Sequence, residues 1–368
     1  MKPVVNCAYN PLLHQPIGKL RMTRQYRAVS LISGGLDSML ATKAVLEQGV
    51  HVEGINFFTG FCVEGHTHAI RKQAKDKPKR NNSLWVAEQL GIKLHIIDIV
   101  EEYKDVVLNP KHGYGANMNP CLDCKIFMVK KAHEWIQENG FDFIITGEVV
   151  GQRPMSQRAA TMPIVARESG AADVLLRPLS AKNLPPSLPE REGWVNREQL
   201  YNFSGRSRKP QMALAEQWGI DEYAQPSGGC CFLTDANYTQ KLKDLWAHRP
   251  SRDYELDDIM LLKIGRHLRP RPNFKMIVSR EEGETNFLEG YKNQFTWIKT
   301  ASCSGPLTIL DGKDISDADI ELAAQLSAKF SKGKHEPQVV CKVARPGETF
   351  REITVAPFAA ELPSDWLL

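Results

Sequence analysis

The chain has 368 residues, of which 42% are hydrophobic and 24% charged, and its formal net charge at pH 7 is +4. This length predicts two or three domains, and no apolar run approaches the roughly eighteen residues that a membrane span needs. Prolines and charges occupy positions 1–26, where a signal peptide would be apolar. We therefore expect a cytoplasmic protein with no membrane partner, reduced cysteines and an oligomeric state that the sequence does not indicate.

Residues 27–180 alternate short apolar runs with amphipathic stretches, a pattern typical of an α/β fold with a doubly wound parallel sheet. The expected strands are 28–32, 51–57, 93–98, 142–146 and 173–176. The expected helices are 38–48, 82–90 and 122–138, each ended by a glycine.

A small-residue turn, Ser33-Gly34-Gly35-Leu36-Asp37-Ser38, joins the first expected strand to the first expected helix. The backbone N–H groups and positive dipole end of a helix N-terminus bind phosphate, and glycines let the backbone approach closely. No lysine follows as in a Walker loop. Because Asp37 would repel a phosphate unless Mg²⁺ bridged them, the turn predicts a site for a magnesium nucleotide.

Two pairs of cysteines form a second group of candidates. Cys121 and Cys124 begin the helix expected at 122–138, where the helix N-terminus and nearby lysines should lower the thiol pKa values. Cys230 and Cys231 are adjacent in the turn-rich PSGGCCF, and the sequence does not decide which of the two is functional. The remaining cysteines, Cys7, Cys62, Cys303 and Cys341, are expected to be isolated.

The rest of the chain divides into a connection with helices, 181–262, and a smaller α/β domain, 263–368. Its proline-rich part, 181–210, is expected to be a surface connection, followed by helices at 212–219, 236–247 and 255–262. In the last domain we expect strands at 275–280, 296–301, 306–310 and 338–344, a helix through Asn286 and Leu288, and another from Asp317 to Phe330. Positive residues crowd one expected loop, 71–80, and another that holds Arg266, Arg269, Arg271 and Lys275. Because the loop 71–80 follows the second expected strand, on the carboxyl side of the sheet where ligands bind, we expect it to contact RNA.

The turn at 33–38 resembles the SGGxDS signature of the PP-loop (N-type) ATP pyrophosphatases, and the resemblance extends over about residues 27–250. It implies that ATP is cleaved between its α and β phosphates and that a substrate oxygen is adenylated. The residues implied in binding ATP and Mg²⁺ are Ser33, Gly34, Gly35, Asp37, Ser38, Phe57, Thr146, Gly147 and Gln152.

Two further motifs resemble tRNA thiolation enzymes. CxxC followed by TGEVVGQ is similar to the tRNA 4-thiouridine synthetases, and PSGGCCF is similar to the second catalytic cysteine loop of the tRNA 2-thiouridylases. From about residue 263 to 355 the chain resembles the NFACT-type RNA-binding domain. The resemblance implies an ATP-dependent tRNA sulfurtransferase, with 4-thiouridine favoured as the product over 2-thiouridine.

Two sulfur chemistries fit these cysteines. In one, Cys230 or Cys231 carries a persulfide and Cys121 or Cys124 resolves it as a disulfide. In the other, which we favour, Cys121, Cys124 and one late cysteine hold a 4Fe-4S cluster, as the resemblance to iron-sulfur thiolation enzymes implies. The alternative without sulfur chemistry is a structural zinc site on these four cysteines.

This pattern departs from that of the 4-thiouridine synthetases, because the first 26 residues are too few for a THUMP domain and no rhodanese tail follows. The expected sulfur donor is therefore another protein, such as a cysteine desulfurase or a carrier, or free sulfide. Two other functions stay open: a PP-loop amidotransferase or synthetase acting on a small molecule, and an RNA-binding protein that only senses ATP.

Overall fold

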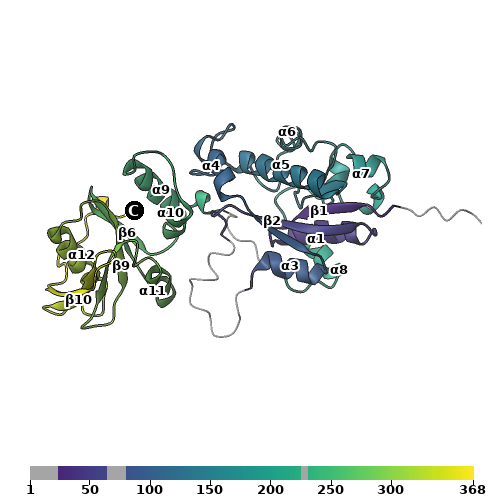
Figure 1. Ribbon diagram of the computed structural model, residues 1–368. Helices are drawn as coiled ribbons and strands as arrows, with labels where there is room; N and C mark the ends of the chain where they lie inside the picture. Colours follow the sequence, from purple (N-terminus) through teal and green to yellow (C-terminus); the bar gives the residue numbers. More distant parts are fainter. Residues whose placement is uncertain (1–23, 64–79, 225–230) are drawn as a thin grey trace, which may run out of the picture.

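The computed structural model describes residues 24–63, 80–224 and 231–368. Its N-terminal half is built on a parallel five-stranded sheet with the order β3-β2-β1-β4-β5 (Figure 1). The strands are β1 (Arg27–Leu31), β2 (His51–Phe58), β3 (Leu94–Asp98), β4 (Phe143–Ile145) and β5 (Leu175–Leu176). The order reverses between β1 and β4, which confirms the doubly wound α/β fold. Ligands of such sheets bind outside the carboxyl ends of the strands at this point.

Helices cover both faces of the sheet (Figure 1). On one face lie α1 (Leu36–Leu46), α3 (Asn82–Leu90) and α8 (Lys209–Gln217). On the other lie α4 (Val100–Leu108), α5 (Cys121–Asn139) and α6 (Met162–Glu168). The helix expected at 82–90 is confirmed, α1 and α5 begin slightly earlier than expected, and α4 and α6 were not expected.

The proline-rich segment expected to be a surface connection is mostly exposed, but it also contributes side chains to the core. It contains η1 (Ala181–Asn183), α7 (Leu188–Arg191) and η2 (Arg197–Gln199). Val195 and Leu200 are buried in the same cluster as the apolar face of α1, and the Trp194 ring stacks on Tyr26 with centroids 4.8 Å apart. A few apolar side chains of this connection therefore fasten it to the sheet domain.

Two helices, α9 (Ala236–Ala247) and α10 (Leu256–Leu261), link the sheet domain to the C-terminal domain (Figure 1). Their apolar residues share a core with Phe61 after β2 and Tyr103 on α4. Phe61 packs edge-on against Tyr254, whose ring centroid is 5.3 Å away, and the Tyr238 hydroxyl donates a 3.0 Å hydrogen bond to the Ile259 carbonyl. The helix pair is therefore continuous with the carboxyl edge of the parallel sheet.

The C-terminal domain has a six-stranded sheet with the order β11-β10-β8-β9-β7-β6, and its neighbouring strands pair antiparallel. Its strands are β6 (Arg266–Arg271), β7 (Phe274–Val278), β8 (Thr296–Thr300), β9 (Leu307–Gly312), β10 (Val339–Ala344) and β11 (Arg351–Val355). Its helices are α11 (Glu282–Glu289), α12 (Asp317–Lys329) and η4 (Ser364–Trp366). The expected α/β content is confirmed, while β6 and β11 were missed because their arginines and polar residues hide the apolar alternation.

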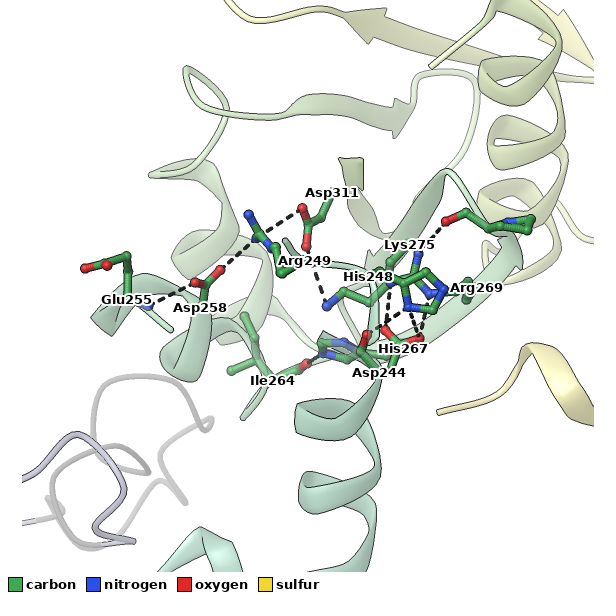
Figure 2. Close-up of polar contacts among 11 residues, drawn as sticks. Asp244, His248, Arg249, Glu255, Asp258, Ile264, His267, Arg269, Lys275 and Asp311 are labelled. Atoms are coloured by element: carbon green, nitrogen blue, oxygen red, sulfur yellow. Dashed lines mark hydrogen bonds and ion pairs between the residues drawn. The ribbon is translucent and has the colours of Figure 1, made fainter. Parts of the chain in front are cut away.

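Charged side chains join α9 to this sheet (Figure 2). Arg269 on β6 donates two hydrogen bonds to the Asp244 carboxylate, 2.6 and 2.7 Å long, and both side chains are largely buried. Lys275 on β7 is 3.6 Å from Asp311, and its side chain is almost entirely buried. Arg269 and Lys275, expected in a basic loop, therefore lie in strands and are paired internally.

Among the described residues, no helix has the length and apolar character to cross a membrane.

Candidate active site

The turn at 33–38 lies between β1 and α1, as expected, and has the geometry of an anion site. Gly34 adopts a positive φ of 76°, and Gly35 begins the helix in an extended conformation with no side chain capping it. The Ser38 hydroxyl donates a 2.8 Å hydrogen bond to the Gly35 carbonyl and accepts a 3.4 Å one from Ser33. The first turn of α1 therefore presents its N–H groups without a competing side-chain acceptor.

Asp37 is held at this turn by three polar side chains from elsewhere in the chain. Gln152 donates a 2.7 Å hydrogen bond to Oδ2 of Asp37, and Gln211 on α8 donates a 2.8 Å one to Gln152. Arg208 lies 3.6 Å from Oδ1. That oxygen is buried and has no hydrogen-bond partner among the described residues, so a hard cation such as Mg²⁺ fits the donor.

Gly147 packs directly against the start of α1. A Cβ at this position would lie 2.5 Å from the Asp37 carbonyl carbon and 2.5 Å from the Ser38 nitrogen. Such distances are well inside van der Waals contact, so only glycine allows the loop after β4 to approach the phosphate turn. This explains the glycine in the TGE motif.

Charges beneath this loop are buried and paired. Glu148 is 1% exposed, accepts a 2.8 Å hydrogen bond from Thr146 and forms a 3.2 Å ion pair with Arg177. Burial raises the pKa of Glu148, but the positive charges of Arg177 and Lys125 outweigh it, so the pKa lies below its ordinary value. Because Lys125 follows Cys124 on α5, this charge contact brings the cysteine helix to the loop after β4.

Cys121 and Cys124 face different surroundings. The Cys121 thiol donates a 3.5 Å hydrogen bond to the Ser156 hydroxyl, in the loop that also carries Gln152. Cys124 instead packs in the core around Phe61 and forms a hydrogen bond with Tyr103. The loop after β4 thus contacts both the phosphate turn and the cysteine helix.

Three thiols, those of Cys62, Cys124 and Cys231, surround the buried hydroxyl of Tyr103. Burial, followed by the electrostatic effect of these thiols, raises the pKa of Tyr103 well above its ordinary value, so the phenol keeps its proton.

Two hydrogen bonds hold the segment before Cys121 next to the segment after Cys231. Asn117 donates a 2.7 Å hydrogen bond to the Thr234 carbonyl, and the Met118 N–H donates a 3.2 Å one to the Leu233 carbonyl.

Cys62, expected to be isolated, is not. Cys62 and Cys231 are opposite one another in a short antiparallel bridge, and the Phe232 N–H donates a 2.9 Å hydrogen bond to the Phe61 carbonyl beside it. Lys263 lies close to this bridge. Its ammonium group contacts the Gly60 carbonyl and lies 5.0 Å from the centroid of the Phe232 ring.

The expected cysteine-bound metal centres find no support in this geometry. Among residues 24–63, 80–224 and 231–368, no three His, Cys, Asp or Glu side chains gather so that they could hold a metal ion. Cys121 and Cys124 share a helix face, yet one thiol contacts Ser156 and the other Tyr103, so with Cys231 they do not fit a three-thiolate cluster. The alternative that uses Cys230 lies outside the described residues, as do Cys7 and most of the basic segment 71–80.

Phe57 is the one expected nucleotide residue away from the turn and the loop. Its side chain is buried in the core beneath α5, and it pairs with Ile97 of β3. Its expected backbone contact with adenine stays a prediction. Arg208, Gln211, Arg177 and Lys263 were not expected; the run RSRK before α8 was a cue for Arg208, whereas no local pattern marks the others.

Comparisons with known proteins divide the chain in two. Residues 23–183 match the family model for the thiamine biosynthesis protein ThiI, and residues 265–367 match the model for the NFACT protein RNA binding domain.

Curated relatives include tRNA-specific 2-thiouridylases named MnmA. The chain is 26% identical to that of Mesoplasma florum over 253 residues, which are 64% of this chain and 63% of the relative. The enzyme of Treponema denticola is 23% identical over 339 residues, covering 83% of this chain and 84% of the relative. The chain thus spans about three fifths of the length of the first of these relatives.

Solved structures with some similarity include a 4-thiouridine synthetase in complex with RNA and bound ATP. It is 20% identical, covers 54% of each chain and has a TM-score of 0.33. The C-terminal part of the fibronectin/fibrinogen-binding protein from Streptococcus suis is 13% identical, with a TM-score of 0.23, and covers 64% of this chain and 87% of its own. At these scores the similarities add nothing to the fold described above.

Proposed function

We propose that this chain is an ATP-dependent sulfurtransferase that makes thiouridine in tRNA, because residues 23–183 match the ThiI family model and residues 265–367 match the model for the NFACT protein RNA binding domain. One observation carries the proposal: a single loop after β4 contacts both the phosphate turn, through Gln152 and Asp37, and the cysteine helix, through Ser156 and Cys121. A phosphate site and a thiol site are thereby joined at one edge of the sheet, as adenylation followed by sulfur attack requires.

In the first step the uridine carbonyl oxygen attacks the α-phosphate of ATP and pyrophosphate leaves. The N–H groups at the start of α1 hold the phosphates, and Arg208 lies where it can offset their charge. Asp37 would hold Mg²⁺, which neutralises charge that develops on the phosphate oxygens. Adenylation turns a poor leaving group into AMP.

In the second step a sulfur carried as a persulfide on Cys231 attacks the activated carbon and AMP leaves. This choice follows from the position of Cys231 beside Lys263, whose positive charge favours the anionic form of a thiol or persulfide. We assign no role to an iron-sulfur cluster, because the described cysteines do not gather in a group that could hold one. The sulfur donor, a desulfurase, a carrier protein or sulfide, acts upstream of this step.

The C-terminal domain supports the proposal that the partner is tRNA. Its match to an RNA-binding family supports binding of the RNA at a distance from the reacting base. The product is 4-thiouridine or 2-thiouridine: the sequence motifs favoured the first, and the curated relatives carry the second in their names. Mass spectrometry of the nucleosides in treated tRNA distinguishes the two.

The adenylation step is tested with an Asp37→Asn variant. Asparagine keeps the size of the side chain but loses the charge that would hold Mg²⁺, so we expect pyrophosphate release to fall about a hundredfold or more. The measurement is pyrophosphate and AMP formed from Mg-ATP in the presence of bulk tRNA that lacks thiouridine.

Two other functions give different results in this assay. A protein that only senses ATP releases no pyrophosphate. An amidotransferase or synthetase releases it without tRNA once its small substrate and ammonia are present, and Cys231→Ser leaves that activity intact. Asp142→Asn, on the opposite edge of the sheet where Asp142 pairs with Arg27, is the matched control and should keep the wild-type rate.

A further inference from the structure

The position of Cys62 gives it a chemical use that no sequence motif indicates. It follows β2, the strand next to β1, and so lies at the carboxyl edge of the sheet beside the phosphate turn. Phe61 is fully buried, and a Cβ on Gly60 would lie 2.5 Å from Ile259 of α10. The backbone that carries Cys62 is therefore held firmly in place.

The pairing of Cys62 with Cys231 has the register that a disulfide needs. The Phe232 N–H to Phe61 carbonyl bond flanks the two cysteines and does not join them, which makes them a non-hydrogen-bonded antiparallel pair. In such a pair the Cα atoms lie about 4.5 Å apart and the side chains are on the same side. Disulfides span Cα separations of about 4.4–6.8 Å, so this one could close with little backbone movement.

The surroundings favour thiol exchange at this pair. Lys263 is a positive group that interacts electrostatically with both thiols: burial lowers its pKa to about 8, and Cys62 and Cys231 oppose that shift. Its ammonium group therefore stabilises whichever of the two sulfurs is anionic. The Cys124 thiol, one of the two expected partners, is hydrogen-bonded to Tyr103. The Cys62 thiol is 3.4 Å from the Thr59 hydroxyl and lies opposite Cys231 in the bridge.

We propose that Cys62 is the resolving thiol for Cys231: after sulfur transfer it forms the Cys62–Cys231 disulfide that releases the thiolated base. This inference rests on the proposed function and specifies which residue completes it. It replaces Cys121 and Cys124, the residues that the sequence suggested for this role.

The proposed transfer conserves atoms and electrons. The terminal sulfur of the Cys231 persulfide attacks the adenylated carbon, AMP leaves with the oxygen, and the base becomes linked to Cys231 through an S–S bond. The Cys62 thiolate then attacks the Cys231 sulfur, which forms the Cys62–Cys231 bond and expels the sulfur on the base as a thiolate, the thiouridine product. The two thiols lose two electrons and the transferred sulfur gains them. A dithiol reductant restores both thiols for the next turnover.

The pairing itself is tested without any catalysis. The reduced full-length chain is treated with the thiol oxidant diamide, and its disulfides are mapped by mass spectrometry of non-reduced peptides. We expect a Cys62–Cys231 link in the wild type and in the control variant Cys303→Ser, whose cysteine lies in the C-terminal domain beside Ser331. A Cys124–Cys231 link, or no link to Cys62, would overturn the proposal.

The chemical role is tested by a single turnover. Full-length protein loaded with inorganic polysulfide is mixed with Mg-ATP and thiouridine-free bulk tRNA, without reductant. In Cys62→Ser the base stays bonded to Cys231, so we expect a tRNA–protein adduct about tenfold above the wild-type level that dithiothreitol releases as thiouridine. The controls Cys303→Ser and Cys124→Ser should show no such adduct.

An adduct that appears in Cys124→Ser and not in Cys62→Ser would contradict the proposal. Failure of the proposed function gives a different result: the wild type then forms neither AMP nor thiouridine, and the diamide map still decides whether Cys62 and Cys231 pair.

Discussion

Single residues set the geometry at the point where the phosphate turn meets the loop after β4. Gly147 allows the two backbones to touch, and Gln152 bonds the carboxylate of Asp37. The buried Oδ1 of Asp37, which accepts no hydrogen bond from the described residues, then remains available to a cation. A change of one methyl group at this contact should therefore be felt at the nucleotide.

Gly147→Ala tests this contact. Its methyl group overlaps the backbone at Asp37 and Ser38, so α1 must shift, and we expect a stability loss of about 1–3 kcal/mol. Because the phosphate turn moves with α1, pyrophosphate release should fall about tenfold to a hundredfold. Thermal melting and the pyrophosphate assay measure the two effects.

Gly290→Ala is the control, since its Cβ would come no closer than 3.4 Å to the Phe287 carbonyl oxygen. If Gly147→Ala melts and turns over like this control, the tight contact is not required.

The predictability of the site differs from residue to residue. The turn at 33–38 was predictable because the strand, the six-residue motif and the helix that form it are contiguous in sequence. Cys62 was not, because its pairing with Cys231 joins positions 169 residues apart through a bridge of one residue pair. Arg208 and Lys263 likewise come to the site only through tertiary packing. Local patterns therefore identified the nucleotide half better than the thiol half.

Elements with strong local periodicity were the most predictable. The helix α9 begins and ends where its apolar spacing indicated, and α3 ends at a left-handed glycine, Gly91. The strand β6 was missed because its arginines and proline resemble a basic loop; its adjacent residues His267 and Leu268 are nonetheless buried. Arg269 of this strand meets its partner, Asp244 of α9, only in the folded chain.

The contact between α9 and β6 should be worth a measurable share of stability. Asp244→Asn leaves the largely buried Arg269 without its two charge-assisted hydrogen bonds, and breaking such a pair costs about 3 kcal/mol. We expect a lower melting temperature for the full chain.

Glu47→Gln is the comparison, because it breaks the more exposed ion pair with Lys43 on α1 and should cost about 0.5 kcal/mol. Equal melting temperatures for the two variants would show that the buried pair contributes little.

At the scale of the whole molecule, the helix pair α9 and α10 connects the thiols at the sheet edge to the C-terminal domain. Its apolar side contributes to the core around Tyr103. On its polar side, Asp244 of α9 is bonded to Arg269 of β6, and Arg249, just after α9, lies 3.5 Å from Asp311 of β9 (Figure 2). Charges are buried at this junction, including Lys275, and His267 is fully buried between them. Stability should therefore depend on pH in a way that this junction sets.

His267 should destabilise the fold in mild acid. Burial, and then the charges of Lys241 and Lys275, lower its pKa well below 6.5, so the folded state keeps the ring neutral. Below pH 6.5 the unfolded chain binds a proton that the folded chain does not, and stability falls as the pH falls; above that pH the ring is neutral in both states and has no effect. Melting temperatures measured at pH 8 and pH 5.5 should differ less in His267→Gln than in the wild type. An unchanged difference would exclude His267 as the cause.

The central claim is that one chain activates a tRNA uridine with ATP and then replaces its oxygen with sulfur. The most direct measurement is quantitative mass spectrometry of nucleosides from thiouridine-free bulk tRNA after incubation with Mg-ATP and the polysulfide-loaded full-length protein. We predict thiouridine and AMP in equal amounts from the wild type, and no thiouridine from Cys231→Ser. ATP turnover by the wild type without any thiouridine, or thiouridine formed equally well by Cys231→Ser, would contradict the account.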